Sequence, residues 1–250
     1  MLKHCSTRFL LPRDLFVSAP ANVCVVIPAA GLGERLGLNQ PKAFVSINNW
    51  SLLSLTIRRV LDIARVGHLI VAVPADFKTE ALEHIDRAMR DANKKIPFDV
   101  VAGGETRTQS VKNSLLALDQ LDSFVLVHDA ARPFVPQSVF EDVIGKLDSG
   151  AKVVIPVIPV SDTIKTVNEK SEVVNTLDRT QLRAVQTPQG FAREVLSEIY
   201  ATTDLKPTTD DAGLAEMAGI NVSTVAGSVE SFKVTTPFDL EMATNFMNRK

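Results

Sequence analysis

The stretch VCVVIPAAGLGERLG, residues 23–37, is followed three residues later by Pro41-Lys42. Its first five residues form a continuous apolar run, which predicts a buried strand. The small residues and glycines that follow allow a backbone to approach a ligand closely, and Arg35 and Lys42 add two positive charges. Because backbone N–H groups and fixed cations together suit a polyphosphate, this stretch predicts a strand that ends in a nucleotide triphosphate loop.

Two better-known phosphate loops do not match this stretch. A Walker A loop needs Gly-Lys-Ser/Thr, which occurs nowhere in the chain. The dinucleotide fingerprint needs a third glycine three residues after the second, but Leu36 stands there and Gly37 comes one position late. The acidic residue expected about 20 residues further on is also missing, because residues 50–55 contain no acid. Hydride transfer on a dinucleotide-binding domain is therefore disfavoured.

Length and composition exclude several classes of partner. The 250 residues allow one large domain, or one domain with an appendage, and can bury a sizeable core. The net charge of -2, together with a single Trp and a single Tyr, argues against a nucleic-acid partner. No apolar run approaches the ~20 residues of a membrane helix, so no membrane partner is expected either.

The cysteines and the first 22 residues bear on localisation. Cys5 and Cys24 cannot form a disulfide framework, and no closely spaced Cys/His set suggests a structural zinc site. Reduced thiols are typical of a cytoplasmic protein. Residues 1–22 stand apart because Asp14 is their only acidic residue. Two interpretations stay open for them, an organelle-targeting segment or a poorly ordered N-terminal extension, and the second is favoured.

Strand-like and helix-like patterns alternate from residue 23 to residue 157. Apolar runs predict strands, and apolar residues that recur every three or four positions predict amphipathic helices. Strands are expected at 23–28, 69–74, 98–102, 124–128 and 152–157, and helices at 52–63, 79–93, 107–121 and 136–147. Repeated strand–helix–strand units predict an α/β fold with a mainly parallel sheet flanked by helices, whose ligands bind beyond the carboxyl ends of the strands.

Residues 160–186 interrupt this alternation. Two β-branched stretches, 163–167 and 173–177, flank a polar run and predict a protruding β-hairpin arm. Because a two-stranded arm is marginally stable alone, we expect it to pack on a second subunit of a homodimer; packing on its own domain is the alternative. Beyond the arm, helices are expected at 193–202, 210–218 and after Pro237, and strands at 222–225 and 232–234. A single domain is thus expected over residues 23–250.

The block His128-Asp129-Ala130-Ala131-Arg132-Pro133 closes the strand expected at 124–128. An Asp that faces a phosphate loop suits Mg²⁺, directly or through water, although Asp also commonly caps a turn. The phosphate loop on a neighbouring strand favours the metal-ligand interpretation. Arg132 can pair with a phosphate or with Asp129, whereas a lone His128 is more often structural.

Two further segments have both a plain and a functional interpretation. Gly103-Gly104 is either a simple strand–helix connection or a backbone edge that hydrogen-bonds a nucleobase, with Ser110 one turn into the helix. Lys233 lies in an apolar, strand-like context, where a buried lysine is costly unless an anion pairs with it. It is therefore either a site cation or a lysine that protects an edge strand.

Taken together, these elements resemble the 2-C-methyl-D-erythritol 4-phosphate cytidylyltransferase family, the CTP-using enzymes of non-mevalonate isoprenoid biosynthesis. The similarity covers about residues 23–249 in the family's order. It is carried by the motifs Pro-Ala-Ala-Gly-x-Gly-x-Arg (28–35), Pro41-Lys42, Gly103-Gly104, Ser110, His-Asp-Ala-Ala-Arg-Pro (128–133), Asp162-Thr163, Asp178-Arg179, Thr187-Pro188-Gln189, Thr209-Asp210 and Lys233-Val234-Thr235. One glycine-rich motif is weak support, but this many motifs in one order are specific.

The resemblance implies a Rossmann-like nucleotidyltransferase whose arm clasps a partner in a homodimer. It implies transfer of CMP from CTP to a polyol phosphate, 2-C-methyl-D-erythritol 4-phosphate, with Mg²⁺ or another divalent cation as cofactor. The implied catalytic residues are Arg35, Lys42 and Lys233, and the implied nucleotide-binding residues are Pro28, Ala29, Ala30, Gly31, Gly33, Gly103, Gly104, Ser110, Asp129 and Ala130. The implied residues for the polyol phosphate are Asp129, Arg132, Thr163, Arg179, Thr209 and Lys233, with Thr163 and Arg179 supplied by the partner subunit. Asp129 is also the implied metal ligand.

The chain departs from the family's pattern at two positions, and two alternatives remain. Glu105 stands where the family often has Asp, and Ala43 where it often has Gln, but neither change removes a reacting group. The ribitol-5-phosphate cytidylyltransferase family tends to have Gly-Gly in place of 29–31 and Ser-Val in place of 130–131, so both places favour the methylerythritol family. The alternative from another class is a non-catalytic nucleotide-binding regulatory domain, and the retained charges of the site argue against it.

Overall fold

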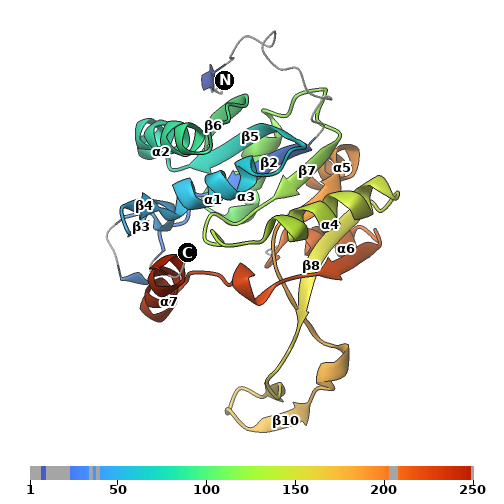
Figure 1. Cartoon of the computed structure of the whole chain (residues 1–250). Helices are drawn as coiled ribbons and strands as arrows, with labels where there is room; N and C mark the ends of the chain where they lie inside the picture. Colours follow the sequence, from blue (N-terminus) through green and yellow to red (C-terminus); the bar gives the residue numbers. More distant parts are fainter. Residues whose placement is uncertain (1–6, 10–22, 34–35, 38–39, 203–207, 249–250) are drawn as a thin grey trace.

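The computed structural model describes residues 7–9, 23–33, 36–37, 40–202 and 208–248. At its centre lies one sheet with helices on both faces (Figure 1). The strands of this sheet are β1 (Thr7–Phe9), β2 (Val23–Pro28), β5 (Val66–Val73), β6 (Phe98–Ala102), β7 (Phe124–Val127), β8 (Val153–Pro159), β11 (Arg183–Val185), β12 (Gln189–Ala192) and β13 (Val222–Ala226). The helices are α1 (Leu52–Leu61), α2 (Lys78–Asp91), α3 (Arg107–Leu115), α4 (Gln137–Asp148), α5 (Arg193–Thr202), α6 (Asp211–Met217) and α7 (Pro237–Asn248). Within the described ranges, no helix is both long and apolar enough to cross a membrane.

The sheet has a parallel centre and a mixed far side. The strand order is β1-β6-β5-β2-β7-β12-β8-β11, and β13 pairs with β8. Strands β6, β5, β2 and β7 run parallel, whereas β12 lies antiparallel between β7 and β8. The predicted fold class is confirmed, but β12 was not foreseen. The segment Gln189–Ala192 has only four residues, and they mix polar and apolar types, so the sequence shows no strand pattern there.

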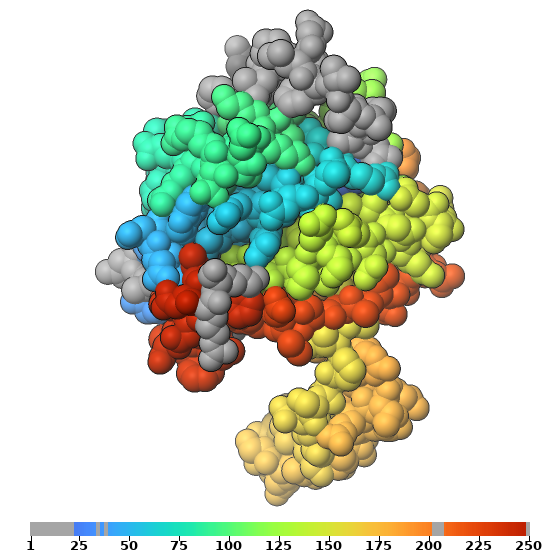
Figure 2. Space-filling model, viewed as in Figure 1, coloured from blue at the N-terminus to red at the C-terminus, as the bar shows by residue number. Residues whose placement is uncertain are grey.

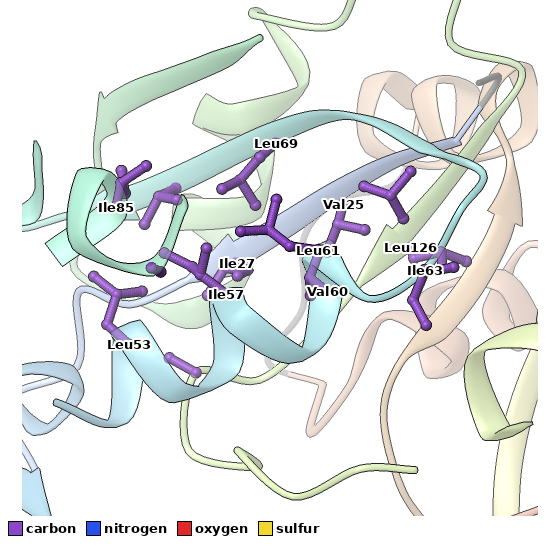
Figure 3. Packing of buried hydrophobic residues seen from close by; sticks show 14 of the residues in the cluster. Val25, Ile27, Leu53, Ile57, Val60, Leu61, Ile63, Leu69, Ile85 and Leu126 are labelled. Atoms are coloured by element: carbon purple, nitrogen blue, oxygen red, sulfur yellow. The ribbon is translucent and has the colours of Figure 1, made fainter. Parts of the chain in front are cut away.

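Two hydrophobic clusters cover the two faces of the sheet. Val25 and Ile27 of β2 belong to one cluster, in which they lie near residues of α1 and α2 (Figure 3). The same cluster includes residues of α4. Cys24 and Val26 belong to the other, which includes residues of α3, α5 and α6. Because successive residues of a strand face opposite sides, a continuous apolar run is what a sheet covered on both faces requires.

Helices α3 and α6 each begin at a side-chain cap. The Thr106 hydroxyl accepts the backbone N–H of Gln109 at 3.0 Å and starts α3. The Asp210 carboxylate accepts the backbone N–H of Gly213 at 3.0 Å and starts α6. Each cap satisfies a backbone donor that has no partner inside the helix. Both helices therefore begin at fixed points.

Three local features differ from the sequence-based expectations. Helix α3 ends at Leu115 rather than at residue 121, because a turn follows in which Asp119 and Asp122 side chains accept backbone N–H groups. Residues 232–234 form no strand. The backbone of this segment bonds to the loop after β7 through the Val234 N–H, which donates to the Ala131 carbonyl. A small hairpin, β3 (Ser46–Ile47) with β4 (Trp50–Ser51), was not predicted.

The predicted arm is present. Strand β9 (Lys165–Val167) pairs antiparallel with β10 (Val173–Thr176), and every residue of both strands is exposed. Figures 1 and 2 show the arm projecting away from the body beyond β8. Of the predicted N-terminal extension, Thr7–Phe9 forms β1 and pairs antiparallel with β6. The remainder lies outside the described residues, so its predicted poor order stays a prediction.

Candidate active site

A cavity of about 500 Å³ opens at the carboxyl ends of β2, β6 and β7. In the central sheet, the next strand in sequence after β2 is β5, which lies on one side of β2, whereas β7 lies on the other side. The strand order therefore reverses between β2 and β7. Crevices at such reversal points are where open α/β sheets bind ligands. The cavity is lined by residues 28–33, 42–43, 104–107, Ser110, 129–131 and Lys233. Its volume is within the range of small-molecule sites.

The glycine loop after β2 forms one wall. The Lys42 backbone N–H donates to the Gly31 carbonyl at 3.1 Å, which folds the loop back onto Lys42. Gly33 has a φ of 68°, and a Cβ added to it would lie 2.6 Å from the Lys42 Cβ. Only glycine fits this position, because both the backbone conformation and the space exclude a side chain. Lys42 is thereby held against the loop.

The corner between β6 and α3 forms the facing wall. The Gly104 N–H donates to Ser110 Oγ at 3.0 Å, and Ser110 Oγ donates to the Thr106 carbonyl at 3.0 Å. A Cβ on Gly103 would lie 2.3 Å from the Ala30 Cβ, so the two walls touch at this point. The Gly104 N–H and the Ser110 hydroxyl are thus bonded to each other, and their predicted contact with a nucleobase stays a prediction.

One carboxylate at the floor of the cavity meets three cations. Asp129 Oδ2 lies 2.7 Å from Lys233 Nζ and 3.7 Å from Arg132 Nε, and Oδ1 lies 3.2 Å from Arg107 Nε. Burial alone would raise the pKa of Asp129, but the charges of Arg107, Lys233 and Arg132 hold that pKa well below its usual range. Asp129 is therefore ionised, and it fixes the cations around it.

Arg107 links this floor to a second carboxylate. Its Nη1 lies 2.6 Å from Asp211 Oδ2, and the Tyr200 hydroxyl donates to Asp211 Oδ1. Burial would lower the pKa of Arg107, but Asp211 and Asp129 raise it above its usual value. The guanidinium thus bridges the start of α3 to the start of α6, and it stays charged.

His128 has a structural position, as its isolation in the sequence predicted. The Thr187 hydroxyl accepts the Asp129 N–H at 3.1 Å and lies 2.9 Å from His128 Nδ1. The ring also packs edge-on against Phe140, with centroids 5.0 Å apart. Burial lowers the pKa of His128 to about 3, so the ring is neutral at physiological pH. It supports the backbone of Asp129 and does not line the cavity.

The cavity gathers most of the residues predicted for the site. The predicted residues that line it are Pro28, Ala29, Ala30, Gly31, Gly33, Lys42, Gly104, Ser110, Asp129, Ala130 and Lys233. Gly103 lies just behind the lining, and Arg132 lies behind Asp129, where its Nη1 donates to the Ser231 carbonyl at 2.6 Å. Thr163, Arg179 and Thr209 are exposed and lie outside this cavity. Arg35 falls outside the described residues.

Sequence reasoning missed Arg107. It follows the glycine pair by three residues, in a block that was singled out only for its backbone. Its position at the carboxyl end of β6 was the available signal, because charged residues at strand ends face the crevice. Its partner Asp211 lies 104 residues away, so nothing local revealed the bridge.

Asp129 is also the residue that fits a divalent cation. An ionised carboxylate oxygen suits Mg²⁺, which usually keeps few protein ligands and takes the rest from substrate phosphates and water. Since Lys233 and Arg107 already neutralise Asp129, its carboxylate alone would hold an ion weakly. The donor set therefore fits an ion shared with a bound nucleotide.

A model of the 2-C-methyl-D-erythritol 4-phosphate cytidylyltransferase family matches residues 23–249. The chain belongs to this family. A cytidylyltransferase of this name from Saccharopolyspora erythraea is 46% identical over 226 residues, covering 89% of this chain and 97% of the relative. The Rhodococcus jostii cytidylyltransferase is 44% identical over 221 residues, covering 88% of this chain and 93% of the relative.

Solved cytidylyltransferase structures share the fold. The Francisella tularensis enzyme superposes with a TM-score of 0.74 at 32% identity, covering 90% of this chain and 99% of that one. The Thermus thermophilus enzyme gives a TM-score of 0.72 at 33% identity, covering 91% and 99%. The resemblance inferred from the sequence is confirmed, as is the expectation of a nucleotidyltransferase.

Proposed function

We propose that the protein transfers CMP from CTP to 2-C-methyl-D-erythritol 4-phosphate, with release of pyrophosphate. The observation that carries this proposal is a cation-lined cavity at the strand-order reversal, built from the glycine loop, Lys42 and Lys233. Cytidylyltransferase relatives that match nearly the whole chain name the nucleotide and the acceptor. The product is 4-diphosphocytidyl-2-C-methyl-D-erythritol.

The chemistry is a single displacement at phosphorus. An oxygen of the acceptor phosphate attacks the α-phosphorus of CTP, and the bond from that phosphorus to the bridging oxygen of the β-phosphate breaks. Negative charge grows on the α-phosphate and on the leaving pyrophosphate, so preorganised cations supply most of the catalysis. Lys42, Arg35 and Lys233 have this role, and no covalent intermediate is needed.

Asp129 acts by holding the cations in place. Its bond to Lys233 fixes an ammonium whose side chain is still 40% exposed and so can meet a phosphate. A divalent cation, which we propose is Mg²⁺, would be held by Asp129 together with the nucleotide phosphates, and it would neutralise phosphate charge. The Gly104 backbone and Ser110 form the edge proposed to receive the cytosine.

The remaining predicted residues complete the site in a dimer. Thr163 and Arg179 lie in the exposed arm, and we propose that they reach the acceptor phosphate in the partner's cavity. The exposed valines of the arm, Val167, Val173 and Val174, support this assembly, because a lone hairpin is marginally stable. Arg132 and Thr209 are proposed for the acceptor in their own subunit. The proposed compartment is the cytoplasm, which suits a buried, unpaired Cys24.

A specific observation favours the methyl-branched acceptor over ribitol 5-phosphate. Ala130 and Ala131 are both buried and line the cavity beside Asp129, so they make a small apolar wall. Such a wall suits a methyl branch, whereas a hydroxyl placed there would lack a partner. This observation does not favour a non-catalytic nucleotide-binding domain.

The experiment is a pyrophosphate-release assay with single omissions. Release is expected with CTP, 2-C-methyl-D-erythritol 4-phosphate and Mg²⁺ together, and not when any one is left out or EDTA is added. ATP, GTP and UTP are the matched controls for the nucleotide. Release from CTP without an acceptor would instead indicate a pyrophosphohydrolase, and no release at all would favour the non-catalytic alternative.

A further inference from the structure

A second polar cluster lies at the opposite end of the sheet from the cavity. Cys24 is the second residue of β2, His68 lies early in β5, Asp99 lies early in β6, and Asp122 precedes β7. All four side chains are buried, with residue exposures between 0% and 5%. Because these are the amino ends of the parallel strands, the cluster plays no part in the cavity at the carboxyl ends. A polar group this deeply buried needs partners.

The geometry of the cluster centres on the His68 ring. Nδ1 lies 2.9 Å from Asp122 Oδ2, and Nε2 lies 3.1 Å from Asp99 Oδ2. Cys24 is the register partner of His68 on the neighbouring strand. Ligand atoms of Cys24, His68 and Asp122 all lie within 4.8 Å of one another. Within the described ranges, this is the only group of three or more His, Cys, Asp or Glu side chains that comes so close together.

We propose that Cys24, His68 and Asp122 bind a Zn²⁺ ion, and that Asp99 orients the His68 ring. A thiolate, an imidazole and a carboxylate are the ligand types that zinc takes, and a thiolate selects against Mg²⁺ and Ca²⁺. A metal-bound imidazole commonly donates its other N–H to a carboxylate, which is the position Asp99 holds at Nε2. Asp122 is itself held, because its Oδ2 accepts the Asp119 backbone N–H at 2.8 Å.

The distances and charges are compatible with an ion. Ligand atoms around a tetrahedral zinc lie roughly 3.3–3.8 Å apart, and the three ligand atoms here lie within 4.8 Å of one another. Without metal, burial raises the pKa of Cys24 to about 11. Burial would lower the pKa of His68, but hydrogen bonds to Asp122, Asp99 and Cys24 raise it to about 12. When Zn²⁺ binds, the thiol and the imidazolium each lose one proton. The two positive charges that leave equal the two that the ion brings, so the net charge of the buried cluster is unchanged.

The spacing of these residues in the sequence gave no sign of a metal site. The four side chains come from four separate segments, and only the parallel register of the sheet brings them together. Since the ligands are buried, the ion would enter as the chain folds, and metal binding would add to folding stability. This differs from the catalytic cation, which would be shared with the nucleotide in an open cavity.

Two measurements on the full chain without a polyhistidine tag test the proposal. Protein from zinc-supplemented cells, dialysed in metal-free buffer, is analysed by mass spectrometry for metals; we expect about one zinc per chain. Refolding with Co²⁺ in place of zinc should give a near-ultraviolet thiolate-to-cobalt charge-transfer band. The described residues that line the catalytic cavity include no cysteine, so a cobalt ion held by them does not produce this band.

Three variants make the result specific. Cys24→Ser should lose the bound zinc and the charge-transfer band, whereas the matched control Cys5→Ser should keep both. Asp99→Asn should keep the band and weaken metal affinity by roughly 10–100-fold, because it loosens the ring orientation. Circular dichroism confirms that each variant is folded. A wild-type protein that folds with substoichiometric zinc and gives no cobalt band would overturn the proposal, and so would a band that survives Cys24→Ser.

Discussion

The two ends of the central sheet hold buried charge clusters of opposite composition. At the carboxyl ends, one carboxylate, Asp129, is surrounded by Arg107, Arg132 and Lys233. At the amino ends, one imidazole, that of His68, is surrounded by two carboxylates and a thiol. The central groups, Asp129 and His68, are both buried, so their neighbours decide what each end can bind. Surplus cations suit phosphate, and surplus acids suit protons or a metal ion.

The pKa values of two buried histidines, His128 and His68, reflect this difference in surroundings. Burial, with the charges of Arg132 and Arg107, lowers the pKa of His128 to about 3 at the carboxyl end. Burial has the same sign at His68, but its hydrogen-bond partners overcome it and raise the pKa to about 12. Without a bound metal ion, the His128 ring is therefore neutral and the His68 ring charged at the same pH. The composition of the surroundings, rather than depth alone, sets the protonation state.

The largest effect is expected from breaking the bridge at Arg107. Arg107→Met leaves Asp211 buried without its cation, and removing one partner of a buried pair costs about 3–5 kcal/mol. The matched control is Arg90→Met, which breaks an exposed pair with Asp86 and should cost no more than about 1 kcal/mol. Urea unfolding of both variants measures the two costs. Equal costs would mean that the bridge does not stabilise the carboxyl end.

The next effect concerns a cation that meets the reacting phosphates. Lys42→Ala should lower turnover by ~10²–10³, the usual loss for one preorganised contact to the transition state. Lys112→Ala is the control, because that lysine is exposed on α3 and lies outside the cavity. Steady-state kinetics with saturating substrates separate the two. A Lys42→Ala enzyme with near-normal turnover would remove Lys42 from the catalytic role.

A pH titration of stability sharpens the histidine comparison. The folded-state pKa of His128 lies below its unfolded value of 6.5, so the unfolded chain takes up the proton first. Stability should therefore fall as pH drops below 6.5, by up to about 1.4 kcal/mol per pH unit from this group. His128→Gln should remove that contribution and flatten the acid limb. The free energy of unfolding is measured in urea at pH 4.5, 5.5 and 6.5. If it falls as steeply with decreasing pH in His128→Gln as in the wild type, the lowered pKa of His128 is contradicted.

Variants of the arm test whether one chain contains a complete active site at the carboxyl ends of the strands. Arg179→Ala and Lys42→Ala proteins should each have low activity, but mixing them should restore activity, because a mixed dimer contains one intact site. With random exchange, half the dimers are mixed, so about a quarter of wild-type activity is expected. The assay needs subunit exchange confirmed by mass spectrometry. No recovery after exchange would place Arg179 in its own subunit's site or outside any site.

Sequence reasoning succeeded where the physical signal is local. The apolar run at 23–27 and the glycines after it predicted both the central strand and the loop that lines the cavity, because strand burial and close backbone approach leave direct marks on a sequence. It failed where partners are remote. The Arg107–Asp211 bridge and the His68 cluster join segments far apart in the chain. The packing of α3 and α6 brings the bridge together, and strand register places Cys24 beside His68. Residues 232–234 were assigned to a strand on their apolar character, yet Val234 packs instead in the cluster beneath α7.

The most direct test of the account follows the α-phosphate of CTP into product. CTP labelled at the α-phosphorus is incubated with Mg²⁺ and equal amounts of 2-C-methyl-D-erythritol 4-phosphate and ribitol 5-phosphate, and the labelled products are separated. The account predicts label in 4-diphosphocytidyl-2-C-methyl-D-erythritol, in at least ~10-fold excess over the ribitol product, since a fitted methyl group is worth about 1–3 kcal/mol. Label mainly in the ribitol product, or equal use of both acceptors, would contradict it.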